Sequence, residues 1–209
     1  LATFLQQQRR TCCLIGICGS GMRSMAQALL EAGHDVIGTD SCLTSAAAAE
    51  AEALSWSAIQ PQIVADTNPQ TIPAASIDMV IASVAIPPDD ATLRQMQVSG
   101  IPCVTLPQAA AALWSGRQQI CIAGTHGKTT TTGLLDSVLS GSGPAPGLFL
   151  GGQILGSDRC GRFGTADVAI IESCEYRRSF HWLNPTMVVL TGNDRDHFDS
   201  FECEAAEQD

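Results

Sequence analysis

Positively charged residues are scarce in this sequence. Its 209 residues include 11 Lys and Arg against 21 Asp and Glu, which gives a formal net charge of -10 at pH 7. Proteins that hold nucleic acid by its phosphate backbone need clustered positive charge, so the composition argues against a nucleic-acid partner. Any nucleotide bound here is expected to be small, with its phosphates met by backbone amides and one lysine.

Long hydrophobic runs are also missing. No apolar stretch approaches the roughly 20 residues that a transmembrane helix requires. The N-terminus lacks the basic-then-apolar order of a secretory signal. With 45% hydrophobic and 15% charged residues, the composition is that of a globular chain. We therefore predict a cytoplasmic protein without membrane contact.

Paired cysteine motifs are absent, although the sequence contains nine cysteines. None lies in a C-x-x-C pattern, the count is odd, and Cys12 and Cys121 fall in apolar, strand-like runs. We predict buried thiols of a reducing compartment. A metal site at Cys12, Cys13 and Cys18 is disfavoured, because structural zinc requires paired spacings and a second pair.

The most informative segment is 120–132, with the sequence ICIAGTHGKTTTT. A strand predicted over Gln119–Ala123 runs into Gly124-Thr125-His126-Gly127-Lys128-Thr129, and helix-compatible sequence follows. This is a shortened G-x-x-G-K-T form of the phosphate-binding loop. Its glycines let backbone N–H groups face an anion, Lys128 adds positive charge, and Thr129 offers a hydroxyl to Mg²⁺. The alternative is a Gly/Thr-rich turn that contains a lysine by chance.

The first part of the chain has a related pattern. An apolar run over Thr11–Ile17, glycines at 16, 19 and 21, a helix with apolar residues at helical spacing, and a strand over Asp35–Thr39 predict a nucleotide-binding βαβ unit. Asp40 follows that strand and is a candidate ligand for a ribose hydroxyl, with a helix-cap or turn role as the alternative. The glycine spacing differs from G-x-G-x-x-G, so a nicotinamide cofactor is disfavoured.

The remaining elements extend both patterns. Strands are predicted over Met79–Ser83 and Cys103–Thr105, and helices over Asp90–Val98 and Gln108–Leu113. Strand–helix alternation restarts near residue 107. We therefore predict an α/β fold with a Rossmann-like parallel-sheet domain over 1–107 and a truncated P-loop ATPase-type domain over 108–209.

Two strands of the second unit are predicted to end at polar residues. Asp167–Ile171 leads to Glu172, and Met187–Leu190 leads to Thr191. Ligands of open α/β sheets bind at the carboxyl ends of strands, so Lys128, Glu172 and the segment 191–197 are expected at one rim. The helix after the phosphate loop is predicted to carry Leu134, Leu135, Val138 and Leu139 on one side.

Several segments together resemble the Mur ligases of peptidoglycan precursor synthesis. In chain order they are GICGSGMRSMAQALLEAGHDVIGTD, ASVAIPPDD, GIPCV, AGTHGKTTTT, FLGG, ESCEYRRSF and DRDHFD. The resemblance implies an ATP-dependent ligase that phosphorylates a carboxylate to an acyl phosphate, which an amine then attacks. It is greatest to members that join L-alanine to UDP-N-acetylmuramate. The alternatives are a recycling ligase that attaches a tripeptide to the same sugar nucleotide, and a non-catalytic nucleotide-binding homologue.

The resemblance also implies residue roles. Lys128 is expected at the β- and γ-phosphates of ATP, Thr129 at one Mg²⁺, and Glu172 with His197 at a second Mg²⁺. Without the resemblance, Glu172 is an exposed acid at a strand end and His197 a solvated loop histidine. The expected ATP-binding residues are Gly124, Thr125, His126, Gly127, Lys128, Thr129 and Thr130. The expected UDP-sugar residues are Gly19, Ser20, Gly21, Met22, Asp40, Ser83 and Val84.

Three departures from the family pattern stand out. Gly192 occupies the position after Thr191 where Asn is usual, and Arg177 stands where an acid is expected. The chain also begins at Leu1 and stops at Asp209, just past His197. We therefore expect part of a longer reading frame, without the domain that binds the amino acid.

Overall fold

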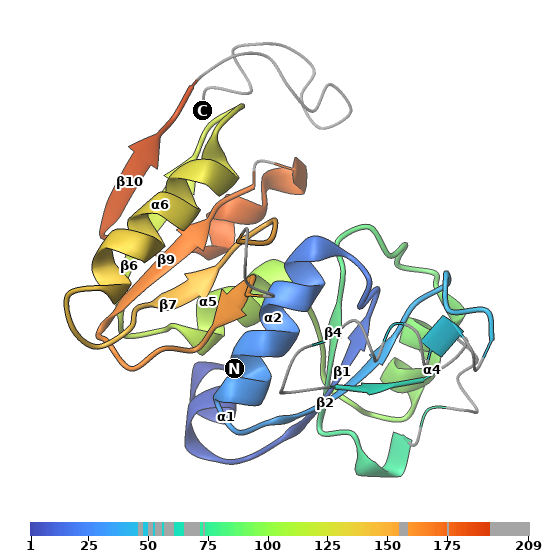
Figure 1. Cartoon of the computed structure of the whole chain (residues 1–209). Coiled ribbons are helices and arrows are strands. Elements are labelled where there is room, and N and C mark those ends of the chain that lie inside the picture. The colour runs from blue at the N-terminus through green and yellow to red at the C-terminus, as the bar shows by residue number, and fades with distance from the viewer. Residues whose placement is uncertain are drawn as a thin grey trace.

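The protein has an α/β fold with two five-stranded sheets. The computed structural model describes residues 1–45, 48–49, 52, 56, 61–64, 72, 74–154, 159–174 and 176–192. Helix α2 (Ser20–Glu31) lies between the two sheets (Figure 1). Within these residues no helix is long and apolar enough to span a bilayer. The predicted α/β class is confirmed.

The first sheet is parallel, with β1 (Thr11–Ile15) at its centre. β1 pairs with β2 (Asp35–Thr39) on one side and with β4 (Met79–Ala82) on the other. β3 (Gln62–Ile63) and β5 (Cys103–Thr105) form the edges. All of β4 is buried, as expected for a parallel strand covered on both faces. Because it directly follows the end of β1, the turn between β1 and α2 lies at the carboxyl edge of the parallel sheet, where α/β proteins bind ligands.

Two helices of the first half, those that start at Ala91 and Leu106, begin directly after residues whose side chains cap them. α1 (Ala2–Gln7) precedes β1, a 3₁₀ turn covers Ala74–Ser76, and α4 covers Ala91–Val98. α5 (Leu106–Leu113) begins two residues before the predicted start at Gln108. The reason is a capping box, in which the N–H of Thr105 donates to Oε1 of Gln108 at 2.8 Å.

The second sheet has the order β10-β6-β9-β7-β8. Its strands are β6 (Gln118–Ala123), β7 (Gly147–Phe149), β8 (Gly161–Arg162), β9 (Val168–Glu172) and β10 (Met187–Leu190). Among the strand pairs that the structure describes in this sheet, only the pairing of β8 with β7 is antiparallel. α6 (Lys128–Ser140) follows β6, and a 3₁₀ segment covers Tyr176–Trp182. The strands predicted to end near Glu172 and Thr191 are present.

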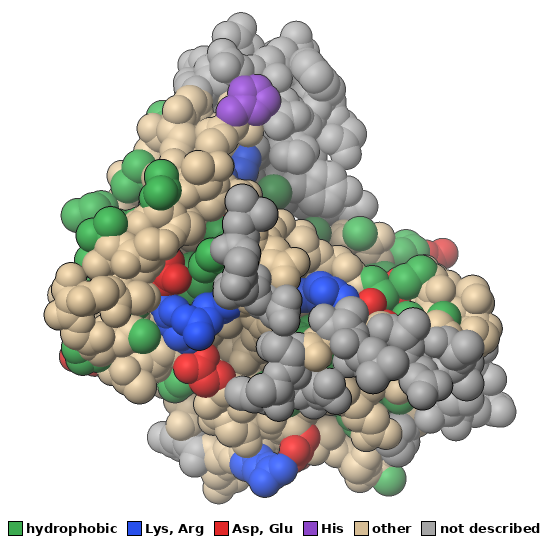
Figure 2. Space-filling model, viewed as in Figure 1, with side chains coloured by type: hydrophobic (Ala, Val, Ile, Leu, Met, Phe, Trp, Pro, Cys, Tyr) green, Lys and Arg blue, Asp and Glu red, His purple; other side chains and the backbone are tan. Residues whose placement is uncertain are grey.

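The apolar side predicted for α6 is only partly covered. Leu135 and Leu139 are half-buried, whereas Leu134 and Val138 are 64% and 66% exposed. The buried residues of the helix are Thr132 and Asp136, and Asp136 forms a buried ion pair with Arg162 of β8. Figure 2 shows hydrophobic side chains on the side of the molecule that α6 and β10 form.

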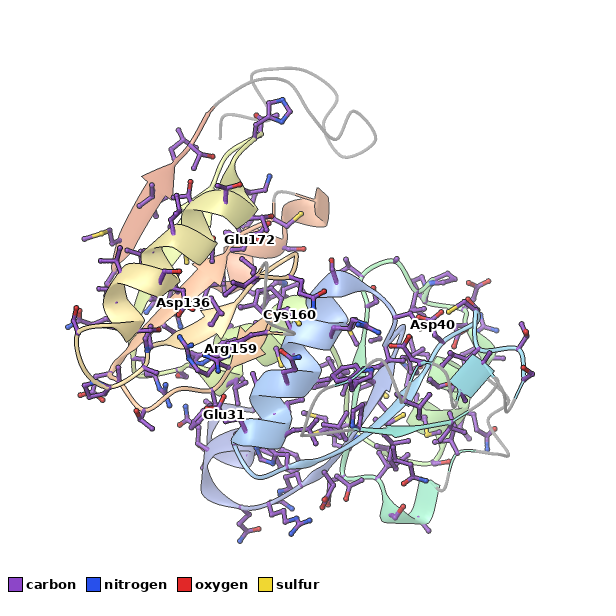
Figure 3. The ribbon with its side chains drawn as sticks, in the orientation of Figure 1. Glu31, Asp40, Asp136, Arg159, Cys160 and Glu172 are labelled. Carbon is purple, nitrogen blue, oxygen red and sulfur yellow. The ribbon has the colours of Figure 1, made fainter. Side chains whose placement is uncertain are left out.

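α2 joins the two sheets through its side chains. Ser24 donates from Oγ to the carbonyl oxygen of Cys160 at 2.8 Å and accepts from the N–H of Leu150 at 3.1 Å. Oε1 of Gln27 accepts the N–H groups of Cys160 and Gly161, both at 2.9 Å. Figure 3 shows Cys160 beside this helix. One hydrophobic cluster includes residues of both sheets, so the two halves share a core.

His34 makes the stability of this fold depend on pH. Its ring is buried, with Nε2 2.9 Å from the carbonyl oxygen of Leu5, and Nδ1 accepts the N–H of Arg10 at 3.1 Å. Burial lowers the pKa of His34 below its ordinary value of 6.5. Below about pH 6.5 the unfolded chain therefore binds a proton at His34 more readily than the folded chain does. The free energy of unfolding should fall as the pH drops below that value.

Urea unfolding at about pH 7.5 and about pH 5.5 checks this dependence. The variant His34→Leu should lose part of the difference between the two pH values, whereas His181→Leu, a change at an exposed histidine, should keep it. If His34→Leu keeps the full difference in the free energy of unfolding between the two pH values, His34 is not the cause of the pH dependence.

Candidate functional site

A cavity of about 370 Å³ lies between the carboxyl ends of the two sheets. Its lining comes from the turn after β1, the turn after β4, the start of α6 and the end of β9. The structure thereby brings together eight of the residues predicted from sequence: Gly19, Ser20, Gly21, Met22, Ser83, Val84, Lys128 and Glu172. The residues expected for two different ligands border the same space.

The phosphate loop has the backbone that its glycines predict. Gly124 has φ of +120°, and a Cβ there would lie 2.6 Å from the carbonyl oxygen of Gly192. Gly127, with φ of +82°, is the residue before α6. The first N–H groups of a helix have no partner within it, so the start of α6 suits an anion. Substitution of Gly124 would displace the loop.

Segment 191–192 holds the loop in place. The N–H of Thr125 donates to the carbonyl oxygen of Gly192 at 3.2 Å, and Oγ1 of Thr191 donates to the carbonyl oxygen of Ala123 at 3.1 Å. Gly192, which stands where Asn is usual in the family, therefore contacts the phosphate loop through its backbone carbonyl oxygen. Nζ of Lys128 donates to the carbonyl oxygens of Gly124 and Thr125, which folds the ammonium back over the loop.

Glu172 and Thr129 form an oxygen-rich pair beside Lys128. Oγ1 of Thr129 donates to Oε1 of Glu172 at 2.9 Å, and the N–H of Gly151 donates to Oε2 at 2.7 Å. A Cβ at position 151 would lie 2.8 Å from Oε1 of Glu172, so a larger residue there would displace this carboxylate. A hydroxyl and a carboxylate are ligands that Mg²⁺ prefers, and the pair fits such an ion.

Other predicted residues lie outside this cavity. His126, Thr129 and Thr130 are exposed on the loop and on the first turn of α6. Asp40 is away from Glu172 (Figure 3), and its carboxylate accepts the backbone N–H groups of Cys18 and Cys42. His197 and the side chain of Arg177 fall outside the described residues, so the role of His197 stays a prediction.

The cavity also contains residues that sequence reasoning missed. Phe149, Phe180 and Leu183 supply apolar surface, and Gly151 borders the carboxylate of Glu172. The FLGG segment contains two of these positions, but the sequence pattern does not distinguish a cavity wall from core. These residues all come from segments after the phosphate loop, and they face apolar residues of α5 and of the turns after β1 and β4 across the cavity.

The cysteines of the first strand are structural. Cys12 and Cys13 alternate across β1 and pack into two different hydrophobic clusters, so they do not form a site with Cys18. Burial raises the pKa of both thiols to about 12, which leaves them protonated at neutral pH. The expectation of buried thiols is confirmed at Cys12 and Cys121, but Cys42 and Cys174 are exposed.

Comparison with known proteins identifies relatives of this chain. Residues 13–118 match the Mur ligase family, catalytic domain. A UDP-N-acetylmuramate--L-alanine ligase of Laribacter hongkongensis is 36% identical over 90% of the chain and 38% of its own length. One of Syntrophomonas wolfei is 30% identical over 90% of the chain and 39% of its length. The chain thus spans about two fifths of the curated relatives it matches.

Solved structures show the same fold. UDP-N-acetylmuramate:L-alanyl-gamma-D-glutamyl-meso-diaminopimelate ligase from Neisseria meningitides has a TM-score of 0.81 and 24% identity, over 96% of this chain and 66% of that one. UDP-N-acetylmuramate-alanine ligase from Thermotoga maritima has a TM-score of 0.74 and 22% identity, over 95% of this chain and 45% of that one. Because the family match covers about half of the sequence and includes the turn between β1 and α2, this chain belongs to the Mur ligase family.

Proposed function

We propose that this chain is the nucleotide-handling part of an ATP-dependent ligase that joins L-alanine to UDP-N-acetylmuramate in peptidoglycan precursor synthesis. The observation that carries the proposal is the shared cavity, where the turn after β1 meets Lys128 and Glu172. The names of the curated relatives support the substrates. The proposal includes a cytoplasmic location, and a division of the chain into a UDP-sugar unit over 1–107 and an ATP unit over 108–209.

The chemistry follows from the residues that border the cavity. Phosphoryl transfer needs alignment and charge neutralisation more than covalent help from the protein. In the proposal, Lys128 and the first N–H groups of α6 hold the β- and γ-phosphates of ATP, while the turn at 19–22 holds the diphosphate of the sugar nucleotide. The carboxylate of the sugar nucleotide then faces the γ-phosphate across one cavity and attacks it, which breaks the bond between the γ-phosphorus and the bridging oxygen and gives an acyl phosphate and ADP.

Magnesium fits the oxygen pair at the start of α6. The family resemblance assigns Thr129 and Glu172 to two different ions, but the 2.9 Å between their oxygens favours one ion shared by both, with His197 as a further predicted ligand. The ion would supply neutralising charge at the phosphates. Oε2 of Glu172 is oriented by the N–H of Gly151, so the carboxylate is already positioned toward Thr129.

The apolar wall suits the second step. The amine of L-alanine must displace phosphate before water does, so the acyl phosphate needs a site with little solvent. Phe149, Phe180 and Leu183 supply such a surface beside Glu172.

Phosphate release by the protein expressed from its full reading frame tests the proposal. We expect phosphate release from ATP only when UDP-N-acetylmuramate and L-alanine are both present. The first substrate supplies the carboxylate that is phosphorylated, and the second supplies the amine that displaces the phosphate. A response to the tripeptide instead of L-alanine would assign the recycling reaction. Binding of the sugar nucleotide and ATP without turnover would indicate the non-catalytic homologue, and tight NADH binding without a response to the sugar nucleotide would overturn the proposal.

A further inference from the structure

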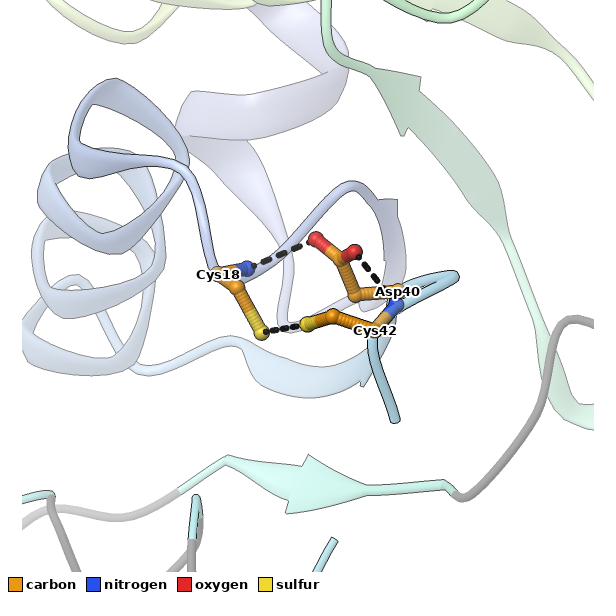
Figure 4. Close-up of side chains that lie close together, drawn as sticks. All are labelled: Cys18, Asp40 and Cys42. Carbon is orange, nitrogen blue, oxygen red and sulfur yellow. Dashed lines mark hydrogen bonds between the residues drawn. The ribbon is translucent and has the colours of Figure 1, made fainter. Parts of the chain in front are cut away.

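Two cysteines and an aspartate meet beyond the carboxyl ends of β1 and β2, away from Glu172. Cys18 lies in the turn after β1, and Asp40 and Cys42 follow β2 (Figure 4). The two Sγ atoms are 3.2 Å apart, and one ligand atom from each of the three residues lies within 4.8 Å of the others. Cys18 and Asp40 are half-buried and Cys42 is exposed, so the cluster can be reached from solvent.

Asp40 fixes the geometry of this cluster. Its Oδ2 accepts the N–H of Cys18 at 3.1 Å, and its Oδ1 accepts the N–H of Cys42 at 3.1 Å. One carboxylate therefore holds both cysteine backbones, in turns that are more than 20 residues apart in sequence. Each carboxylate oxygen has a second lone pair, which is available to a metal ion. Hydrogen bonds from the backbone to a carboxylate are the usual means of orienting it as a metal ligand.

We propose that Cys18, Asp40 and Cys42 form a binding site for Zn²⁺. Two thiolates and a carboxylate are a zinc donor set, and the exposed side at Cys42 leaves the fourth position to water. In a tetrahedral site with Zn–S bonds near 2.3 Å, the sulfurs are about 3.8 Å apart, so the observed pair must open by roughly 0.6 Å. A disulfide requires about 2.05 Å, which is a closure of more than about 1 Å. The metal site needs the smaller displacement.

The binding step is an exchange of protons for a metal ion. Two S–H bonds break, two Zn–S bonds form, the protons pass to solvent, and no oxidation occurs. Burial is the main cause that raises the pKa of the Cys18 thiol, and the hydrogen bond from Cys42 and the charge of Asp40 raise it further. The folded protein therefore presents this thiol protonated, and Zn²⁺ affinity should rise with pH.

Cobalt substitution and zinc titration of the reduced, metal-free protein test this site. With Co²⁺ alone as the probe, we expect one equivalent per chain, a sulfur-to-cobalt charge-transfer band, and the intense visible absorption of a tetrahedral ion. Zn²⁺ should displace Co²⁺ stoichiometrically and release protons into a weakly buffered solution. Cys18→Ser and Cys42→Ser should each weaken Co²⁺ binding at least about 10-fold, as loss of a ligand does.

Cys103→Ser is the matched control, since Cys103 is another half-buried thiol at the edge of the same sheet. It should bind Co²⁺ as the unchanged protein does, and circular dichroism should show that all three variants are folded. The proposal fails if the reduced protein binds no stoichiometric Co²⁺ or if the spectrum is octahedral. Equal affinities in Cys18→Ser and Cys103→Ser would also refute it. No nucleotide is present, so the result is independent of the proposed ligase activity.

Discussion

Lys128→Ala should abolish the phosphate release that depends on both substrates. Lys128 is the only basic side chain that lines the cavity among the described residues, and it lies at the start of α6 beside Glu172. Removal of one preorganised charge or donor at a site of developing negative charge lowers turnover by about 10²- to 10³-fold. Because Lys128 is also proposed to hold the nucleotide, ATP affinity should fall together with turnover.

Steady-state phosphate release by the full-length protein, together with calorimetric titration of ATP, measures both effects. Arg94→Ala is the control, because Arg94 is an exposed cation on α4, outside the cavity. It should leave turnover and ATP affinity unchanged. Full activity of Lys128→Ala would contradict the placement of ATP at this loop, whereas weaker ATP binding with normal turnover would assign Lys128 to binding alone.

Asp136→Ala should cause a large loss of stability where α6 packs on the second sheet. Arg162 and Asp136 form an ion pair with both side chains 5% exposed, and Nε of Arg162 also donates to the carbonyl oxygen of Pro146 at 2.8 Å. The other terminal nitrogen of Arg162, Nη1, is buried without a hydrogen-bond partner. Removal of the carboxylate leaves an uncompensated buried charge, for which the expected cost is about 3–5 kcal/mol.

Urea unfolding of the chain measures this cost, with Asp89→Ala, at an exposed acid, as the control. The double variant Asp136→Leu with Arg162→Met should recover most of the stability, because it removes both charges and restores apolar volume. A loss below about 1 kcal/mol in Asp136→Ala would mean that water reaches Arg162. The ion pair would then not determine how α6 packs on the sheet.

The sequence predicted those parts of the fold whose signals are local. The strands before the two glycine turns are short apolar runs, and their alternation with helices implies parallel pairing. The phosphate loop was predictable because its function depends on backbone shape, which Gly124 and Gly127 encode directly. The meeting of Lys128 with Glu172 followed from the rule that carboxyl ends of parallel strands share one edge.

The parts that were missed depend on contacts between distant segments. β7 and β8 have three and two residues, too few to show a period, and exist because they pair with β9 and with each other. The inner side of α6 is set by Asp136 and Arg162, a pairing that hydrophobic periodicity does not indicate. The hydrogen bonds of Asp40 match the turn role that the sequence left open for it, while its contact with a ribose stays a prediction.

The side chains of α2 have a mechanical consequence for ligand binding. The helix begins at the turn that borders the cavity, while Ser24 and Gln27 hydrogen-bond to the segment before and within β8. A rotation of one sheet against the other would break these bonds or open the shared core. While both are intact, the turn after β1 and the phosphate loop therefore keep a fixed spacing, and so do the two ligands proposed to bind there.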